Sequence, residues 1–377
     1  MKKRKVYFFI VFLLLLSTSA FADPADDTSA ELAASLDDNA LVAQLLLTGI
    51  EGKRELTQAM RTLLEKFPAG GIMLFAYNLD SSKGEVKALL SETSRIAAAK
   101  TGIPPFMAVD HEGGLVHRFG AVAARLPPAF SFWELSQKEG PGAAIERAGT
   151  LYTRSAGEIS ELGINMVLGP VAETLNNDNR LFLETRSFGP EADFTLAAAS
   201  AYIKSMNSAG IASVVKHFPG NTAADPHSKA SVLNDEKPAL DEMVRTFAGI
   251  ISGLEPPAIM LSHVMVPALD SRRNASLSRP VIEDWLRGEL GFKGIVIADD
   301  FSMGAVAATG LSHEEAAVEA LNAGVDMIMV WPMNIASVHA AILKALHEGS
   351  LPRERLLEAA GRIIREKLRY GIIALSE

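Results

Sequence analysis

Charged and imidazole side chains stand directly at the ends of several short apolar runs in this sequence. Asp110 ends one run, the pair Lys216-His217 ends another, and Asp299 ends a third. Carboxylates, lysine and histidine are the side chains of acid–base and nucleophilic chemistry on polar substrates. Five of the eight histidines lie at or just beyond such run ends, namely His111, His117, His217, His227 and His263. The pattern predicts one reactive site assembled from several chain segments.

Eight apolar runs with helical patterns between them would position these side chains. Each run has the length of a strand, shows little polar alternation and has glycine or proline nearby, which is typical of strands buried on both faces of a parallel sheet. Amphipathic helical patterns fill the gaps, for example over residues 55–67 and 352–370. The runs are 45–50, 71–75, 106–110, 164–169, 212–216, 258–264, 294–299 and 327–331.

Eight buried strands alternating with helices predict an α/β fold, specifically a single (β/α)8 TIM-type barrel. An open doubly wound sheet is the alternative, but the dinucleotide fingerprint G-x-G-x-x-G is absent from the sequence. Active sites of such barrels lie at the C-terminal ends of the strands. The residues that end the apolar runs are therefore expected to meet at one face.

The composition is that of an ordinary globular protein. Apolar residues make up 48% and charged residues 21% of the 377 residues, and there is no cysteine. A disordered tail protein, a collagen-like repeat and a disulfide scaffold are thereby excluded.

The N-terminus has the three parts of a secretory signal peptide. Basic residues 2–5 precede an apolar run over residues 6–16, and the A-x-A sequence at 20–22 predicts cleavage before Asp23. An uncleaved N-terminal anchor is the alternative, although the run is short for a membrane-spanning helix. We therefore expect residues 1–22 to be a signal peptide and the protein to be exported to the periplasm or the extracellular space.

The chain that remains after cleavage would be strongly acidic. Removal of four basic residues changes the formal charge from −9 to −13 over 355 residues. We therefore expect no nucleic-acid partner and no stable membrane contact after cleavage, and we expect a monomer. Residues 23–39 are expected to form an acidic spacer that leads into a first helix, and residues 40–377 to form the barrel domain.

Four blocks of the sequence closely resemble the signature motifs of family 3 glycoside hydrolases, in the branch of β-N-acetylglucosaminidases. They occur in the family's order, and the resemblance extends from about Leu41 to the C-terminus. It implies a retaining glycosidase that forms a covalent glycosyl-enzyme intermediate. The blocks are AVDHEGGLVHRFG (108–120), ETRSFGP (184–190), VVKHFPG (214–220) with the following Asp225-Pro226-His227, and GIVIADDFSMGAV (294–306).

The resemblance implies that Asp299 is the nucleophile that attacks the anomeric carbon. The alternative is that Asp299 caps a helix, since a helical stretch begins nearby. Asp300 is the better candidate for a cap, because strand alternation places the two carboxylates on opposite sides.

The resemblance also implies that His227 is the acid/base and that Asp225 fixes its tautomer. The alternative is a solvated loop in which Asp-Pro is a turn former. This block departs from the family's pattern, because Asn221-Thr222 replace His-Gly, the loop is two residues shorter, and Pro226 separates the two members of the pair. The position of His227 is therefore left open.

Substrate-binding positions carry over in the same way. Hydroxyl-rich sugars need carboxylates that accept hydrogen bonds beside lysine and arginine that donate them. The resemblance implies that the sugar is bound by Asp110, Arg118, Arg186, Lys216 and His217.

Three features modify this picture of the pocket. The arginines 118 and 186 have an alternative role as structural ion pairs with strand-end carboxylates. Glu112 and His263 are expected to support the site and not to react. Leu115 replaces the arginine that the family commonly has in a GGRV stretch, and we expect looser electrostatics around Asp110.

Other functions stay open beside hydrolysis of terminal β-linked N-acetylglucosamine from peptidoglycan fragments or chitooligosaccharides. They are a relative with another sugar or a phosphorylase activity, and a non-catalytic glycan-binding protein with a degenerate acid/base loop. A metal-dependent hydrolase is a further class, although Lys216 would repel a divalent cation. We expect no cofactor and no metal. Ligands for such a metal would be Asp110, His217, Asp225, His227 and His263.

Overall fold

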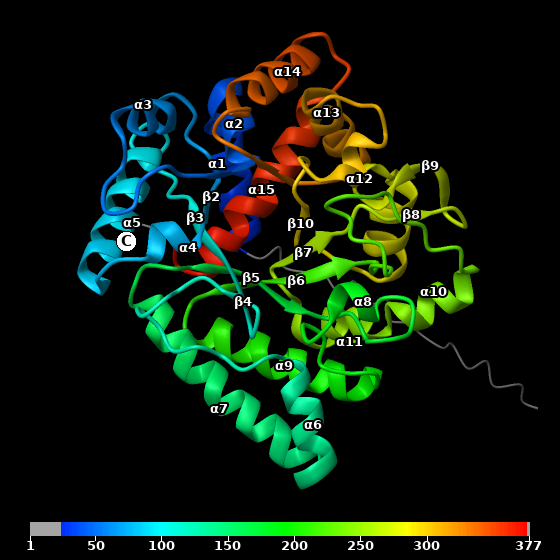
Figure 1. Ribbon diagram of the computed structural model, residues 1–377. Helices are drawn as coiled ribbons and strands as arrows, with labels where there is room; N and C mark the ends of the chain where they lie inside the picture. Colours follow the sequence, from blue (N-terminus) through cyan, green and yellow to red (C-terminus); the bar gives the residue numbers. More distant parts are fainter. Residues whose placement is uncertain (1–23, 375–377) are drawn as a thin grey trace, which may run out of the picture.

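Residues 24–374 are described by a computed structural model, whose core is a closed barrel of eight parallel strands (Figure 1). Each strand pairs with the next along the chain, and β11 pairs with β1 to close the barrel. The predicted (β/α)8 barrel is thus confirmed. The strands are β1 (Leu46–Gly49), β2 (Gly71–Leu74), β3 (Phe106–Gly113), β5 (Met166–Val171), β6 (Ala212–Phe218), β7 (Ala258–Leu261), β10 (Ile295–Ala298) and β11 (Met327–Val330).

All eight predicted apolar runs contain a barrel strand, because strands enclosed by helices must be apolar on both faces. Every residue of these strands is buried except Asp110, which is partly exposed. Three strands continue beyond the predicted ends, to Gly113, Val171 and Phe218. The extension places the Lys216-His217 pair inside β6.

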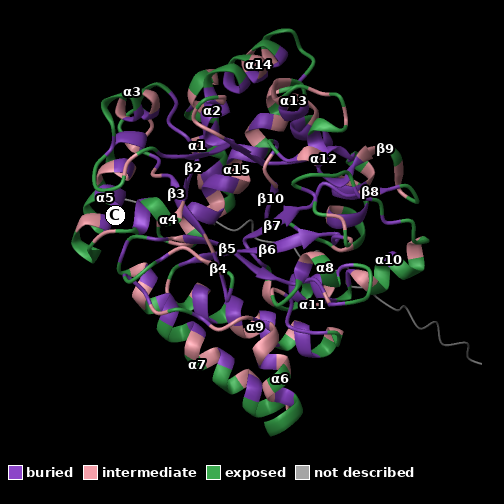
Figure 2. Ribbon diagram, viewed as in Figure 1, coloured by how far each residue is buried: buried purple, intermediate pink, exposed green. Residues whose placement is uncertain are grey.

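Helices surround the barrel, with their buried faces toward the strands and their exposed faces toward solvent (Figure 2). The patterns over 55–67 and 352–370 correspond to α3 and α15. None of the helices between residues 24 and 374 is both long and apolar enough to cross a membrane. The main helices are α2 (Asp38–Gln44), α3 (Gln58–Lys66), α5 (Lys83–Ala98), α6 (Phe130–Glu139), α7 (Pro141–Ser160), α9 (Ala192–Ser208), α10 (Lys237–Met243), α11 (Arg245–Leu254), α13 (His313–Ala323), α14 (Ile335–His347), α15 (Arg353–Arg369) and the π-helical η2 (Pro280–Glu289).

Short elements decorate the connections between barrel strands and helices. They include α4, α8 and α12, which follow β2, β5 and β10 respectively, and these connections carry the candidate site. Their bounds are α4 (Ala76–Leu79), β4 (Val116–His117), α8 (Arg180–Leu183), β8 (Met265–Val266), β9 (Asp270–Asn274), the 3-10 turn η1 (Ala275–Leu277) and α12 (Gly304–Ala307).

The acidic segment 23–39 differs from the expected spacer. It contains α1 (Pro24–Ser35), which packs against α15, and the start of α2. Ala33 and Leu36 are buried in the main core. Alanine and leucine favour the helix and give it an apolar side, so this segment is part of the barrel domain. The predicted signal peptide, residues 1–22, lies outside the described residues.

The N-terminal end of the barrel is held by buried ion pairs. The carboxylate of Asp326 accepts hydrogen bonds from Arg287, Arg355 and Arg362 at 2.6, 2.7 and 2.9 Å. Burial raises the pKa of Asp326, but the three guanidinium groups outweigh burial and lower it. These bonds connect η2 and α15 to the start of β11.

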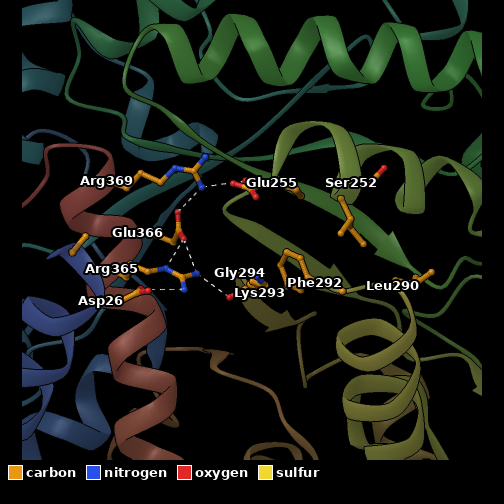
Figure 3. A pocket seen from close by; sticks show the side chains of 14 residues that line it. Asp26, Ser252, Glu255, Leu290, Phe292, Lys293, Gly294, Arg365, Glu366 and Arg369 are labelled. Atoms are coloured by element: carbon orange, nitrogen blue, oxygen red, sulfur yellow. Dashed lines mark hydrogen bonds and ion pairs between the residues drawn. The ribbon is translucent and has the colours of Figure 1, made fainter. Parts of the chain in front are cut away.

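A pocket at this end of the barrel lies between α15 and the chain before β10 (Figure 3). Arg365 donates to Glu366 at 3.0 Å and to the carbonyl of Lys293 at 2.8 Å. Arg369 donates to the carbonyl of Glu255 at 3.1 Å. The two arginines of this pocket therefore bond to other groups of the protein, which suits a structural role.

Candidate active site

The opposite end of the barrel gathers the predicted reactive side chains. Asp110 and Glu112 come from β3, Lys216 and His217 from β6, and Asp299 follows β10. All of these positions lie at the C-terminal ends of parallel strands, which converge in a barrel of this type.

Lys216 is the centre of an ion-pair network. Its Nζ atom donates to Asp110 Oδ1 at 2.9 Å and lies 2.7 Å from Glu112 Oε1, and its side chain is only 4% exposed. Burial lowers the pKa of Lys216, but the two carboxylates outweigh it and raise the pKa overall. Lys216 is therefore held as a cation in the pocket. Arg118 approaches the other oxygen of Asp110, at 3.5 Å.

Arg186 joins this network through Glu112. Its Nε and Nη2 atoms donate to the two oxygens of Glu112 at 2.7 and 2.8 Å, the bidentate geometry that suits a guanidinium and a carboxylate. Burial raises the pKa of Glu112, yet Lys216 and Arg186 lower it well below its usual range. Glu112 is thus a fixed anion that takes two of the five N–H donors of Arg186, and the other donors remain for the predicted contact with the sugar.

Glu173 is a member of the site that the sequence analysis missed. Its side chain is buried and accepts from His217 Nδ1 at 2.7 Å and from Asn221 Nδ2 at 2.9 Å. It also accepts from the backbone N–H groups of His217 and Asn221. Because a carboxylate accepts, Nδ1 of His217 carries the proton and Nε2 is its free nitrogen. Glu173 could have been found among the residues that follow the fourth apolar run. Strand β5 continues past Gly169-Pro170 to Val171 and thereby brings Glu173 to the strand end.

Asp299 is partly buried beside two histidines, a lysine and a backbone N–H group. Its Oδ1 accepts from the backbone N–H of Asp300 at 2.8 Å. Desolvation raises the pKa of Asp299, but His217, His263, the Asp300 N–H and Lys216 outweigh this effect and lower it. A carboxylate that stays ionised while partly withdrawn from water is suited to nucleophilic attack.

Asp300, and not Asp299, bonds to the residues that follow the strand end. Its oxygens accept from the N–H and the hydroxyl of Ser302 at 2.8 and 2.7 Å, and from Trp331 Nε1 at 3.0 Å. Helix α12 begins only at Gly304, without a side-chain cap. The alternative of a helix cap therefore does not apply to Asp299, and Asp300 forms a turn instead.

His263 supports the same strand ends. Its Nδ1 and Nε2 atoms lie 2.7 Å from Ser276 Oγ and 3.2 Å from the carbonyl of Asp300. Burial lowers the pKa of His263, against a smaller opposing effect of Asp299. Both ring nitrogens are engaged, as expected for a supporting residue.

The Asp225–His227 pair lies on an exposed loop that follows β6. Nδ1 of His227 lies 2.7 Å from Asp225 Oδ1, and the His227 N–H donates to the same oxygen at 3.0 Å. The hydrogen bond from His227 lowers the pKa of Asp225. Pro226 does not prevent the pairing, and Nε2 of His227 is left for chemistry.

The loop is attached to the connection that follows Asp299. Gly304 N–H donates to the carbonyl of His227 at 2.9 Å, and Ala305 N–H donates to the carbonyl of Pro226 at 3.1 Å. The shortened loop and Asp299 are therefore parts of one rim.

The side chains considered above as metal ligands bond to other groups of the protein. Throughout the part of the chain that the structure describes, no three histidine, aspartate or glutamate side chains gather in an arrangement that could hold a metal ion. Asp110 pairs with Lys216, and His217 pairs with Glu173.

Comparisons with known proteins agree with this architecture. Residues 37–366 match the family model described as glycosyl hydrolase family 3 N terminal domain. A β-hexosaminidase of Stenotrophomonas maltophilia (strain K279a) is 32% identical over 319 residues, which cover 81% of this chain and 90% of that protein. The structure of a glycoside hydrolase family 3 β-N-acetylglucosaminidase from Paenibacillus sp. str. FPU-7 aligns with a TM-score of 0.84 and 30% identity, over 91% of this chain and 64% of that one.

Some relatives are considerably longer than this chain. Beta-hexosaminidase A of Pseudoalteromonas piscicida is 26% identical over 333 residues, and the matched part is 54% of its length. The chain thus spans about half of that protein.

Proposed function

The chain belongs to glycosyl hydrolase family 3, and from this premise we propose that it is an exported, retaining exo-β-N-acetylglucosaminidase. Its substrates are peptidoglycan fragments or chitooligosaccharides that end in β-linked N-acetylglucosamine. Names of relatives support the reaction class, and the signal-like residues 1–22 support export.

One observation carries the proposal: an ionised Asp299 shares a rim with a hydrogen-bonded Asp225–His227 pair. In the first step the Asp299 carboxylate attacks the anomeric carbon while protonated His227 gives its Nε2 proton to the leaving oxygen. The glycosidic bond breaks and a glycosyl ester of Asp299 forms. In the second step neutral His227 takes a proton from water, which attacks the ester and releases the sugar and Asp299.

The remaining residues bind the terminal sugar. Asp110 accepts hydrogen bonds from its hydroxyl groups, and Lys216 and Arg118 donate to hydroxyl oxygens. His217 is oriented by Glu173 and lowers the pKa of Asp299, so it favours the attacking anion.

The reaction is tested with residues 23–377 on 4-nitrophenyl N-acetyl-β-D-glucosaminide and the corresponding glucoside. Asp299→Ala removes the nucleophile and should lower the rate by at least ~10³-fold. Asp193→Ala, on the exposed side of α9, is the matched control and should keep full activity. Near-normal turnover by Asp299→Ala would contradict the role of Asp299. A folded wild-type protein that is silent on both sugars would favour the glycan-binding alternative.

The role of His227 is tested by comparing leaving groups. His227→Ala should lower hydrolysis of natural glycosides by ~10²–10⁴-fold, because their leaving oxygen needs a proton. Nitrophenyl glycosides should lose less in the first step, and an equal loss on both would contradict the acid role. Product analysis with and without phosphate separates hydrolysis from phosphorolysis.

A further inference from the structure

Three aromatic rings at the mouth of the barrel have no role in the mechanism above. Phe75 follows β2 and Trp331 follows β11, and their ring centroids are 5.2 Å apart. Tyr77 stacks on Phe75 with a centroid distance of 6.0 Å and an interplanar angle of 4°. These rings, here called the aromatic strip, connect the two strand ends on either side of β1.

The barrel leaves space for the strip at Gly49, the last residue of β1. A Cβ atom at this position would lie 3.3 Å from Trp331 Cζ3 and 3.6 Å from Phe75 Cε2. A Cβ atom would therefore crowd the Trp331 ring and would contact the Phe75 ring at an ordinary distance. The end of β1 is shaped so that the rings lie across it.

Hydrogen bonds hold both ends of the strip. Trp331 Nε1 donates to Asp300 Oδ2 at 3.0 Å, directly beside Asp299. Tyr77 Oη donates to the carbonyl of Ile50 at 2.7 Å. The ring of Tyr77 nevertheless remains half exposed. The strip thus has one end fixed beside Asp300 and an exposed ring at Tyr77, whose apolar face is open to a ligand.

Apolar exposure is concentrated on this end of the molecule. Within residues 24–374, each exposed large hydrophobic side chain lies on a connection that follows a barrel strand. The outer faces of the long helices in this same range show none of this exposure. The side chains are Tyr77, Leu115, Leu181, Val232 and Met333.

The chemistry of the mouth is therefore divided. The ends of β3 and β6 carry the ion-pair network of Asp110 and Lys216, whereas the residues after β2 and β11 are aromatic. Asp299 follows β10, which is the neighbour of β11. The aromatic strip therefore begins beside the reactive carboxylate, through the bond from Trp331 to Asp300.

We propose that the aromatic strip binds the leaving-group sugar, the pyranose attached to the terminal N-acetylglucosamine through the bond that is cleaved. This inference rests on the proposed function. The C–H face of a pyranose is apolar, so it buries area against the rings of Tyr77 and Trp331. The strip thus selects substrates whose leaving group is a sugar ring over glycosides of small alcohols.

The test compares two leaving groups of similar departure tendency. N,N′-diacetylchitobiose carries a sugar ring, and 2,2,2-trifluoroethyl N-acetyl-β-D-glucosaminide carries a small alcohol without a ring. Tyr77→Ala should lower kcat/KM for the disaccharide roughly tenfold and leave the trifluoroethyl glycoside within about twofold. Tyr77 is chosen because its hydrogen bond is to Ile50 and its ring stacks on Phe75, whereas Trp331 bonds to Asp300. Tyr77→Phe keeps the ring, loses only the bond to Ile50, and is the matched control that should retain both values.

Trp331→Phe provides a second variant. It keeps a ring at this position and removes the bond to Asp300, so both rates can change but their ratio should stay near that of the wild type. An equal loss on both substrates in Tyr77→Ala, or no loss on either, would overturn the role of the strip while the proposed function stands. A wild-type protein that hydrolyses neither glycoside would overturn the proposed function and this inference together.

Discussion

At the scale of single residues, Glu173 controls how His217 is presented to the site. Four hydrogen bonds converge on its two oxygens from His217 and Asn221. Its acceptor-only carboxylate is matched by donors on every side. The electrostatic interaction with His217 in turn lowers the pKa of Asp299.

Glu173→Gln should lower kcat/KM roughly ten- to a hundredfold, since an amide N–H would face the donors that now bond to the carboxylate. The loss should fall mainly on kcat, and the pH profile should change on its acidic side, because Asp299 loses part of the influence that keeps it ionised. Steady-state kinetics between pH 4 and 8 measure both effects. Glu134→Gln, at an exposed position of α6, is the control. A variant with the wild-type profile and an unchanged kcat would show that Glu173 is only structural.

At the scale of elements, the loop that carries the Asp225–His227 pair depends on the start of α12. A Cβ atom at Gly304 would lie 2.9 Å from the carbonyl oxygen of His227 and 2.9 Å from the carbonyl carbon of Ser228. Both neighbours are backbone atoms, which cannot rotate away. Glycine at this position therefore permits the close approach that attaches the loop to the rim.

Gly304→Ala should displace the loop and with it His227. Hydrolysis of N,N′-diacetylchitobiose should fall roughly tenfold in kcat/KM, and nitrophenyl glycosides should lose less because their leaving group needs little protonation. Gly157→Ala in α7 is the matched control, since an added Cβ meets nothing within 4 Å there. An unchanged ratio between the two substrates would contradict a specific effect on the loop.

At the scale of the whole molecule, buried histidine links folding to pH. His111 is fully buried, and its Nε2 lies 2.7 Å from Ser155 Oγ. Burial lowers the pKa of His111 from 6.5 to about 3. His111 therefore binds a proton below pH 6.5 in the unfolded chain, but only below about pH 3 in the folded protein.

The free energy of unfolding should accordingly decrease as the pH falls below 6.5, and His111 should contribute about 1.4 kcal/mol per pH unit. Urea unfolding of wild type and His111→Asn between pH 4.5 and 7.5 measures this contribution as a difference in slope. His347→Asn, an exposed residue at the end of α14, should keep the wild-type slope. Identical slopes for wild type and His111→Asn would contradict the assignment.

The sequence by itself determined the barrel and the main members of the site. Buried parallel strands need continuous apolar runs, and these are readable without a structure. The C-terminal ends of parallel strands converge, so Asp110, Lys216 and Asp299 could be placed together from their positions at the run ends. The Asp225–His227 pair was expected from the family resemblance, and its two side chains meet because they are close neighbours in the chain.

Only the tertiary structure decided the contacts between distant segments. Glu173 bonds to His217 across 44 residues of chain, and Trp331 reaches Phe75 over Gly49 because β11 closes the barrel against β1. The acidic segment at the start became α1 because α15 offers it a surface to pack on. The local sequence pattern indicates whether a residue is buried, but it does not indicate which distant residue it contacts. Those contacts form only when the barrel closes and the loops pack on its rim.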